Sequence, residues 1–184
     1  MQPPSPDAYQ PRLTRWTHTW RLLAAIAISA LAWSSVWTHQ WQQTRMLFWV
    51  DLGLGLAGVP LVLVRRRYPL AVPVVLAVMS SVSASAIGPG VLAGVSLATR
   101  RRLPQILLVG VVSVLSGALF SATQQNYLPT PLWAQVIVSV AVTVATLAIG
   151  MYVGSRRELL WTLQDRAERA EDEQELRVRE ARSK

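Results

Sequence analysis

The chain has 184 residues, of which 52% are hydrophobic and 15% are charged, and its formal net charge at pH 7 is +8. The segment from Ser155 to Lys184 holds eight basic and eight acidic residues, so the whole net charge lies before it. The arginines before Ser155 fall in short clusters between apolar stretches, which is typical of a membrane protein and not of a nucleic-acid-binding surface, so we expect no nucleic-acid partner. Cysteine is absent, and this excludes disulfides, thiolate metal sites and cysteine nucleophiles.

The chain divides by composition into three parts. The first eleven residues contain four prolines and few apolar side chains, so they cannot bury enough surface to fold. We expect a disordered cytoplasmic N-terminus over residues 1–15, a transmembrane sensor bundle over residues 16–154 and a charged cytoplasmic linker helix over residues 155–184.

Five apolar stretches follow the N-terminal segment, and the sequence therefore predicts an all-α, polytopic membrane helix bundle. They are Leu22–Thr38, Met46–Val64, Leu70–Thr99, Pro104–Ala122 and Leu132–Gly154. A bilayer core of ~30 Å takes about 20 helical residues, which four of the stretches roughly match. The third is too long for one crossing, and Gly88-Pro89-Gly90 predicts a turn inside it. We expect either two short crossings or a re-entrant hairpin there.

Arginine clusters set the expected orientation, because cytoplasmic loops retain positive charge. The clusters are Arg12, Arg15 and Arg21; Arg65–Arg67; Arg100–Arg102; and Arg156–Arg157. All four lie on the cytoplasmic side if the bundle has six crossings, or four crossings plus a hairpin. Both termini are then cytoplasmic, and the loops left outside are 39–45 and 123–131.

Two tryptophans, Trp37 and Trp41, stand beside the first outer loop. With Trp33 they repeat every four residues, which predicts one face of the first helix and its extension. We favour an interfacial anchor over an aromatic ligand cage.

Asp51 is the one acidic residue inside an apolar stretch. A carboxylate in a bilayer costs ~2.5–3.5 kcal/mol at the centre on insertion scales, so it should face the bundle interior or water. Two alternatives stay open: a buried polar contact or sensing role, and a side chain that reaches the outer interface.

Small residues at four-residue spacing predict close helix contacts within the bundle. The series are Gly90, Gly94 and Ala98; Ser113, Gly117 and Ser121; and Thr146, Gly150 and Gly154. Gly150 and Gly154 lie where the last apolar stretch becomes the charged segment. A dimer contact there would join the bundle to any coiled coil below it.

The charged segment after Gly154 has helix-forming composition and contains no glycine or proline. We expect one continuous helix from about Leu132 to Arg182. A sparse heptad with apolar positions Leu160, Leu163, Ala167 and Ala170 favours a parallel dimeric coiled coil about as much as a lone solvated helix.

The sequence carries no motif of an enzyme. It contains no glycine-rich phosphate loop, no metal-ligand spacing and no Ser/His/Asp set in a plausible order. We therefore assign no catalytic, cofactor-binding or metal-binding residue, expect no cofactor, and expect no enzymatic activity from this chain.

Three features point to a family. Asp51-Leu52 opens the second apolar stretch, Arg65-Arg66-Arg67-Tyr68-Pro69 leads to the third, and RRELLWTLQDRAERAEDEQELRVREAR follows the last. Together they resemble the N-terminal membrane portion of bacterial sensor histidine kinases of the high-GC Gram-positive type, in the nitrate/desaturase-regulator class. The resemblance runs from about Trp16 to Lys184 and breaks off before the family's phosphoacceptor histidine and ATP-binding domain.

The resemblance implies a membrane sensory and dimerisation module of a two-component system. Its partners would be the lipid bilayer, a second copy of the chain, a downstream kinase core and, through that core, a response regulator. On this view the chain is a truncated piece or a gene fragment. Two alternatives remain: a free-standing membrane adaptor whose charged helix binds a cytoplasmic partner, and a small transporter subunit.

Overall fold

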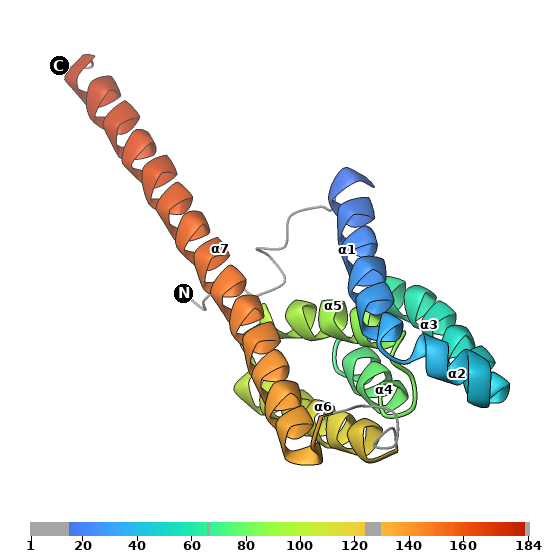
Figure 1. The fold of residues 1–184 in the computed structure, drawn as a ribbon. Helices are drawn as coiled ribbons and strands as arrows, with labels where there is room; N and C mark the ends of the chain where they lie inside the picture. The colour runs from blue at the N-terminus through green and yellow to red at the C-terminus, as the bar shows by residue number, and fades with distance from the viewer. Residues whose placement is uncertain (1–14, 66, 124–129, 183–184) are drawn as a thin grey trace.

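A computed structural model describes residues 15–65, 67–123 and 130–182, and within them the chain is all α-helical. Seven helices make up this described part, and Figure 1 shows their arrangement. Their bounds are α1 (Arg15–Ser34), α2 (Trp37–Gln43), α3 (Arg45–Val64), α4 (Ala71–Met79), α5 (Ile87–Ala98), α6 (Leu103–Thr123) and α7 (Leu132–Arg182). The expected disorder of residues 1–15 lies almost wholly outside the described residues, as do most of the residues of the second outer loop.

Three of these helices, α3, α6 and α7, are long and apolar enough to cross a membrane. Helix α3 has 20 residues and α6 has 21, which match the ~20 that a bilayer core requires. Most of the large apolar side chains on these helices are exposed, among them Leu56, Leu107, Leu115, Val138 and Ile149. A helix bundle in water would bury such residues, so their exposure agrees with a lipid surrounding.

The first helix ends earlier than the tryptophan spacing predicts. Ser34 and Ser35 each donate a side-chain hydrogen bond of 2.7 Å to the carbonyl three residues back, which competes with the helical pattern. The chain then restarts as the short helix α2. A continuous extension of the first helix through Trp41 was therefore wrong, and much of the expected loop 39–45 is helical.

Helices α4 and α5 form a hairpin of two short pieces, of nine and twelve residues. Neither reaches the ~20 residues of a full crossing. The turn between them spans residues 80–86, so the prediction of a turn at Gly88-Pro89-Gly90 was wrong in its position. Those three residues begin α5, where a proline is tolerated because the first-turn N–H groups have no helical partner.

Helix α5 is the centre of the packing, since it contacts α1, α3, α4, α6 and α7. Val62, Val72, Leu76 and Ala93 form a buried apolar cluster between α3, α4 and α5. The hairpin is thus enclosed by the longer helices.

Helix α7 is a single helix of 51 residues, and Figure 1 shows its last part leading away from the bundle. At 1.5 Å per residue its length is about 77 Å, more than twice a bilayer core. The prediction of one continuous helix from Leu132 to Arg182 is confirmed.

Candidate functional site

The carboxylate of Asp51 is fully buried and accepts four hydrogen bonds. Its Oδ1 accepts from the Ser83 hydroxyl at 2.7 Å and from the Ser85 backbone N–H at 2.9 Å. Its Oδ2 accepts from the Gln40 side-chain amide at 2.9 Å and from the Ala84 backbone N–H at 3.2 Å. Asp51 therefore caps the turn between α4 and α5, and the alternative of a side chain that reaches the interface is excluded.

Further hydrogen bonds extend this network to α1. The Trp33 indole N–H donates to the side-chain oxygen of Gln40 at 3.2 Å. The Ser29 hydroxyl donates to the Ser85 carbonyl at 2.6 Å, and the Ser85 hydroxyl donates to the Asp51 carbonyl at 2.5 Å. We call Ser29, Gln40, Asp51, Ser83 and Ser85 the Asp51 network. It joins α1, α2, α3 and the α4–α5 turn in one buried set of polar contacts.

Sequence reasoning found Asp51 but missed its partners. The signal available was the run Ser80-Ser81-Val82-Ser83-Ala84-Ser85, which places four hydroxyls inside an apolar stretch. Serines are favoured at turns because their hydroxyls bond to nearby backbone groups. That pattern predicts the turn better than the Gly-Pro-Gly that follows it.

Trp37 and Trp41 lie beside this network, about half exposed. Trp37 meets Trp33 edge-on with ring centroids 6.2 Å apart, and Trp41 meets Phe48 with centroids 5.0 Å apart. Arg45 lies over the Trp41 ring, 5.3 Å from its centroid. Each ring packs against another aromatic ring and stays about half exposed, which is the arrangement of an anchor at an interface.

Two of the three predicted small-residue series, those on α5 and α7, meet one another across these helices. A Cβ added at Gly150 would lie 2.5 Å from the Ala98 Cβ and 2.7 Å from the Val95 carbonyl oxygen. A Cβ added at Gly154 would lie 2.6 Å from the Thr99 carbonyl oxygen. Gly150 and Gly154 therefore lie in close contact with α5. These two glycines let the backbone of α7 approach α5 directly.

One ion pair holds α7 to the turn between α5 and α6, where Arg101 binds Glu158. Arg101 has a φ of 55°, a left-handed conformation that is uncommon for a residue other than glycine. Both side chains are about half exposed, so the pair contributes at most ~1 kcal/mol. It lies at the level where the charged part of α7 begins.

The predicted coiled-coil positions Leu160, Leu163, Ala167 and Ala170 are all exposed on α7. Nothing in the described part of the chain packs against them. Their side of the helix is therefore accessible to another molecule.

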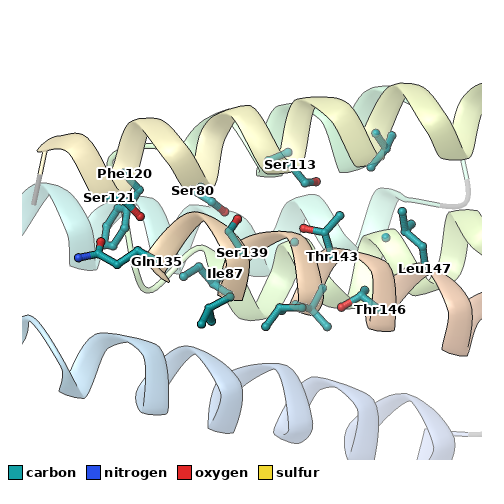
Figure 2. Close-up of a pocket in the computed structure, with 18 of the residues that line it drawn as sticks. Ser80, Ile87, Ser113, Phe120, Ser121, Gln135, Ser139, Thr143, Thr146 and Leu147 are labelled. Atoms are coloured by element: carbon teal, nitrogen blue, oxygen red, sulfur yellow. The ribbon is translucent and has the colours of Figure 1, made fainter. Parts of the chain in front are cut away.

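A pocket of about 460 Å³ lies between α4, α5, α6 and α7. Apolar side chains form most of its wall, and hydroxyl groups interrupt them at Ser80, Ser113, Ser121, Ser139, Thr143 and Thr146. Figure 2 shows Gln135 and Ser121 at one end and Thr146 and Leu147 at the other. We call this the hydroxyl pocket. Because its polar groups are neutral, it suits an apolar guest with few hydrogen-bonding atoms.

A second pocket, of about 560 Å³, is lined by α1, α5 and α7 and by residues just after α3 and α5. Arg21, Arg65, Arg100 and Arg157 all line it, one from each of the four arginine clusters of the sequence. We call it the arginine pocket. The folding of the chain thus brings one arginine from each of four clusters that are far apart in sequence to the same pocket.

The described residues contain no group of three histidine, aspartate or glutamate side chains that could hold a metal ion. The prediction that the chain has no catalytic or cofactor-binding residue stays a prediction. The Asp51 network and the two pockets are the candidate sites that remain.

Comparison with known proteins gives one family. No curated protein and no solved structure matches the chain. A family model described as a domain of unknown function, DUF8318, matches residues 18–159. These residues run from the first turn of α1 to the point where α7 leaves the bundle, which is more than half of the chain. The chain therefore belongs to the DUF8318 family.

Proposed function

We propose that this chain is the membrane sensory and dimerisation module of a two-component sensor histidine kinase. The observation that carries the proposal is the continuity of α7, whose 51 residues join the bundle to the charged segment without a break. A continuous helix transmits a shift or rotation made at one end to the other end. The partner at the far end is a kinase core and, through it, a response regulator.

Four helices, α1, α3, α6 and α7, cross the membrane in this proposal, and both termini are cytoplasmic. The α4–α5 hairpin enters from the cytoplasmic side and returns to it. Its short helices support this arrangement, because irregular backbone at membrane depth is tolerated only where protein encloses it. The turn at residues 80–86 is enclosed in this way, since two of its N–H groups bond to the buried Asp51.

The arginine pocket supports the same orientation. Its four arginines come from all four clusters, so one end of the bundle carries the positive charge that marks a cytoplasmic face. A transporter subunit is less well supported, because the carboxylate of Asp51 is fully buried by its partners and does not line either pocket.

A parallel dimer of α7 completes the relay. The heptad positions from Leu160 to Ala170 are exposed, and a seam this poor in apolar area is only marginally stable. Marginal stability suits a relay, because a small movement of the spans then shifts the balance between two helix pairings.

The test is a fusion of residues 1–184 to the phosphoacceptor and ATP-binding core of a sensor histidine kinase. Inserting seven residues after Ala170 keeps the heptad phase, whereas inserting two rotates the helix by about half a turn. We expect the seven-residue insertion to keep the autophosphorylation level of the parent fusion and the two-residue insertion to change it. Equal activity in all three proteins would overturn the relay and favour the membrane adaptor. The coding sequence after Lys184 gives an independent check, since the proposal requires a phosphoacceptor histidine there.

A further inference from the structure

The arginine pocket has both positively charged and apolar side chains in its wall. Four of its lining residues are arginines, and the rest of the wall is largely apolar, including Ala24, Ile28, Val91, Ile149 and Val153. No aspartate or glutamate is among the described residues that line it. A guest therefore meets positive charge at one part of the wall and hydrocarbon at another.

The arginines that line the pocket are buried to different degrees. Arg65 is buried, with its Nε donating to the Ser96 hydroxyl at 2.9 Å and its Nη1 donating to the Val62 carbonyl at 2.8 Å. Arg21, Arg100 and Arg157 are half-buried. A guanidinium carries five N–H donors, so an arginine that is already bonded to the protein can also bind a phosphate oxygen.

The neighbours of these arginines in the sequence are placed differently. Arg67, Arg102 and Arg156 come from three of the same clusters, but they are exposed and do not line the pocket. The local sequence of a cluster therefore does not decide which arginine faces the cavity; the packing of α1, α5 and α7 does.

We propose that the arginine pocket binds an anionic phospholipid, with the phosphate among the arginines and an acyl chain against the apolar wall. A volume of about 560 Å³ exceeds what a headgroup phosphate needs, and the apolar part of the wall gives a free inorganic anion no contact. A basic pocket between spans on the cytoplasmic side faces the leaflet that carries anionic lipid. The inference goes beyond the proposed function, because it rests only on the folded bundle in the proposed orientation and requires neither a kinase core nor a dimer.

The test uses the full chain purified in a neutral, non-ionic detergent, where no charged surface is present. Phosphatidylglycerol and phosphatidylcholine are titrated separately, and bound lipid is counted by native mass spectrometry. We expect one phosphatidylglycerol per chain at low concentration, and weaker binding of phosphatidylcholine. Millimolar inorganic phosphate should not displace the phosphatidylglycerol.

Two triple variants with the same charge separate the pocket from general basicity. The pocket variant is Arg21→Gln, Arg100→Gln and Arg157→Gln, and the control is Arg67→Gln, Arg102→Gln and Arg156→Gln. Each basic residue near an anionic headgroup contributes about a factor of five, so the pocket variant should bind phosphatidylglycerol roughly a hundredfold more weakly. The control should lose less than about fivefold.

Three results would overturn the proposal. Equal losses in the two variants would indicate a diffuse basic surface, and displacement by inorganic phosphate would indicate a simple anion site. Equal binding of phosphatidylcholine would remove the role of the arginines. Thermal unfolding of each variant without lipid shows whether it is folded. If the pocket variant is not, the single variant Arg157→Gln against Arg156→Gln gives the same comparison, with an expected ratio of about five.

Discussion

The hydroxyl of Ser83 donates a 2.7 Å hydrogen bond to the buried carboxylate of Asp51, although 32 residues separate the two in sequence. The bond joins the tip of the α4–α5 hairpin to the side of α3. Two backbone N–H groups next to Ser83 bind the same carboxylate. The other N–H groups of the turn, from Ser80 to Ser83, bond to backbone carbonyls three or four residues back. Asp51 thus satisfies two further N–H groups of the turn inside an apolar bundle, where unpaired polar groups are costly.

Replacing Asp51 should destabilise the bundle in proportion to the donors left without a partner. Asp51→Asn keeps the size of the side chain but turns an NH₂ group toward two of the four donors, and we expect it to lower the free energy of unfolding by about 1–3 kcal/mol. Asp51→Leu removes every acceptor, so its effect should be larger than that of Asp51→Asn. Both values are measured by unfolding in mixed micelles.

Gly53→Ala is the control for this series. Gly53 lies on the same helix, and a Cβ added there would meet nothing within 4 Å. Its stability should stay within about 0.5 kcal/mol of the parent. If Asp51→Leu proved as stable as Gly53→Ala, the hydrogen bonds to Asp51 would have no role in holding the hairpin.

Gly150→Ala should separate α7 from α5. The added methyl group would lie 2.7 Å from the Val95 carbonyl oxygen, and backbone cannot move aside as a flexible side chain can. We expect a loss of about 1–3 kcal/mol, the usual cost of overpacking. The same unfolding measurement applies.

Gly94→Ala tests whether any alanine introduced into the α5–α7 contact lowers the free energy of unfolding as Gly150→Ala should. Gly94 belongs to the same α5–α7 contact, but its added Cβ would lie 3.7 Å from the Thr146 methyl carbon, an ordinary van der Waals distance. This variant should therefore be close to the parent in stability. Similar losses at Gly94 and Gly150 would mean that helix propensity or lipid exposure, and not the clash, sets the effect.

Regular features of this fold were predictable, because they depend on local patterns. Apolar length located the membrane-sized helices α3 and α6, and the lack of glycine and proline after Gly154 predicted the continuity of α7. Four-residue spacing found Gly150 and Gly154 because a helix places such residues on one face. Each of these patterns lies within a single helix, so it can be recognised without knowing how the helices pack.

The partners of these features were not predictable, because they depend on how elements meet. Nothing near Asp51 in the sequence indicates a contact with Ser83 or Ser85. The hydroxyl groups of these serines would fit a solvent-exposed loop equally well. The arginine pocket was even less predictable from the sequence. Arg100 and Arg102 have the same local sequence character, yet only Arg100 lines the cavity. Such distinctions appear once α1, α5 and α7 are packed.

Orientation in the membrane can be tested by labelling single cysteines in intact cells, since the chain has no native cysteine. Gln42→Cys and Thr130→Cys should react with an impermeant thiol reagent, because both positions are exposed near the ends of spans proposed to lie outside. Arg67→Cys and Arg102→Cys, also exposed, should react only after the cells are permeabilised. Reaction of Arg102→Cys in intact cells would contradict this topology, because it would place the end of the hairpin and the start of α6 on the outer side of the membrane.

Crosslinking of single cysteines along α7 tests the dimer that the proposed relay requires. If two α7 helices pair in parallel through the heptad, disulfide formation should peak at Leu160, Leu163, Ala167 and Ala170, since these side chains would meet their own copies. The chain offers a matched control in Leu159. It is 60% exposed and Leu160 is 53% exposed, so exposure alone predicts equal crosslinking at the two positions. Pairing through the heptad predicts that Leu160→Cys crosslinks several times faster than Leu159→Cys, because Leu159 lies one position off the seam. Equal rates would leave α7 a monomeric helix, and the charged segment would then be available to a different cytoplasmic protein.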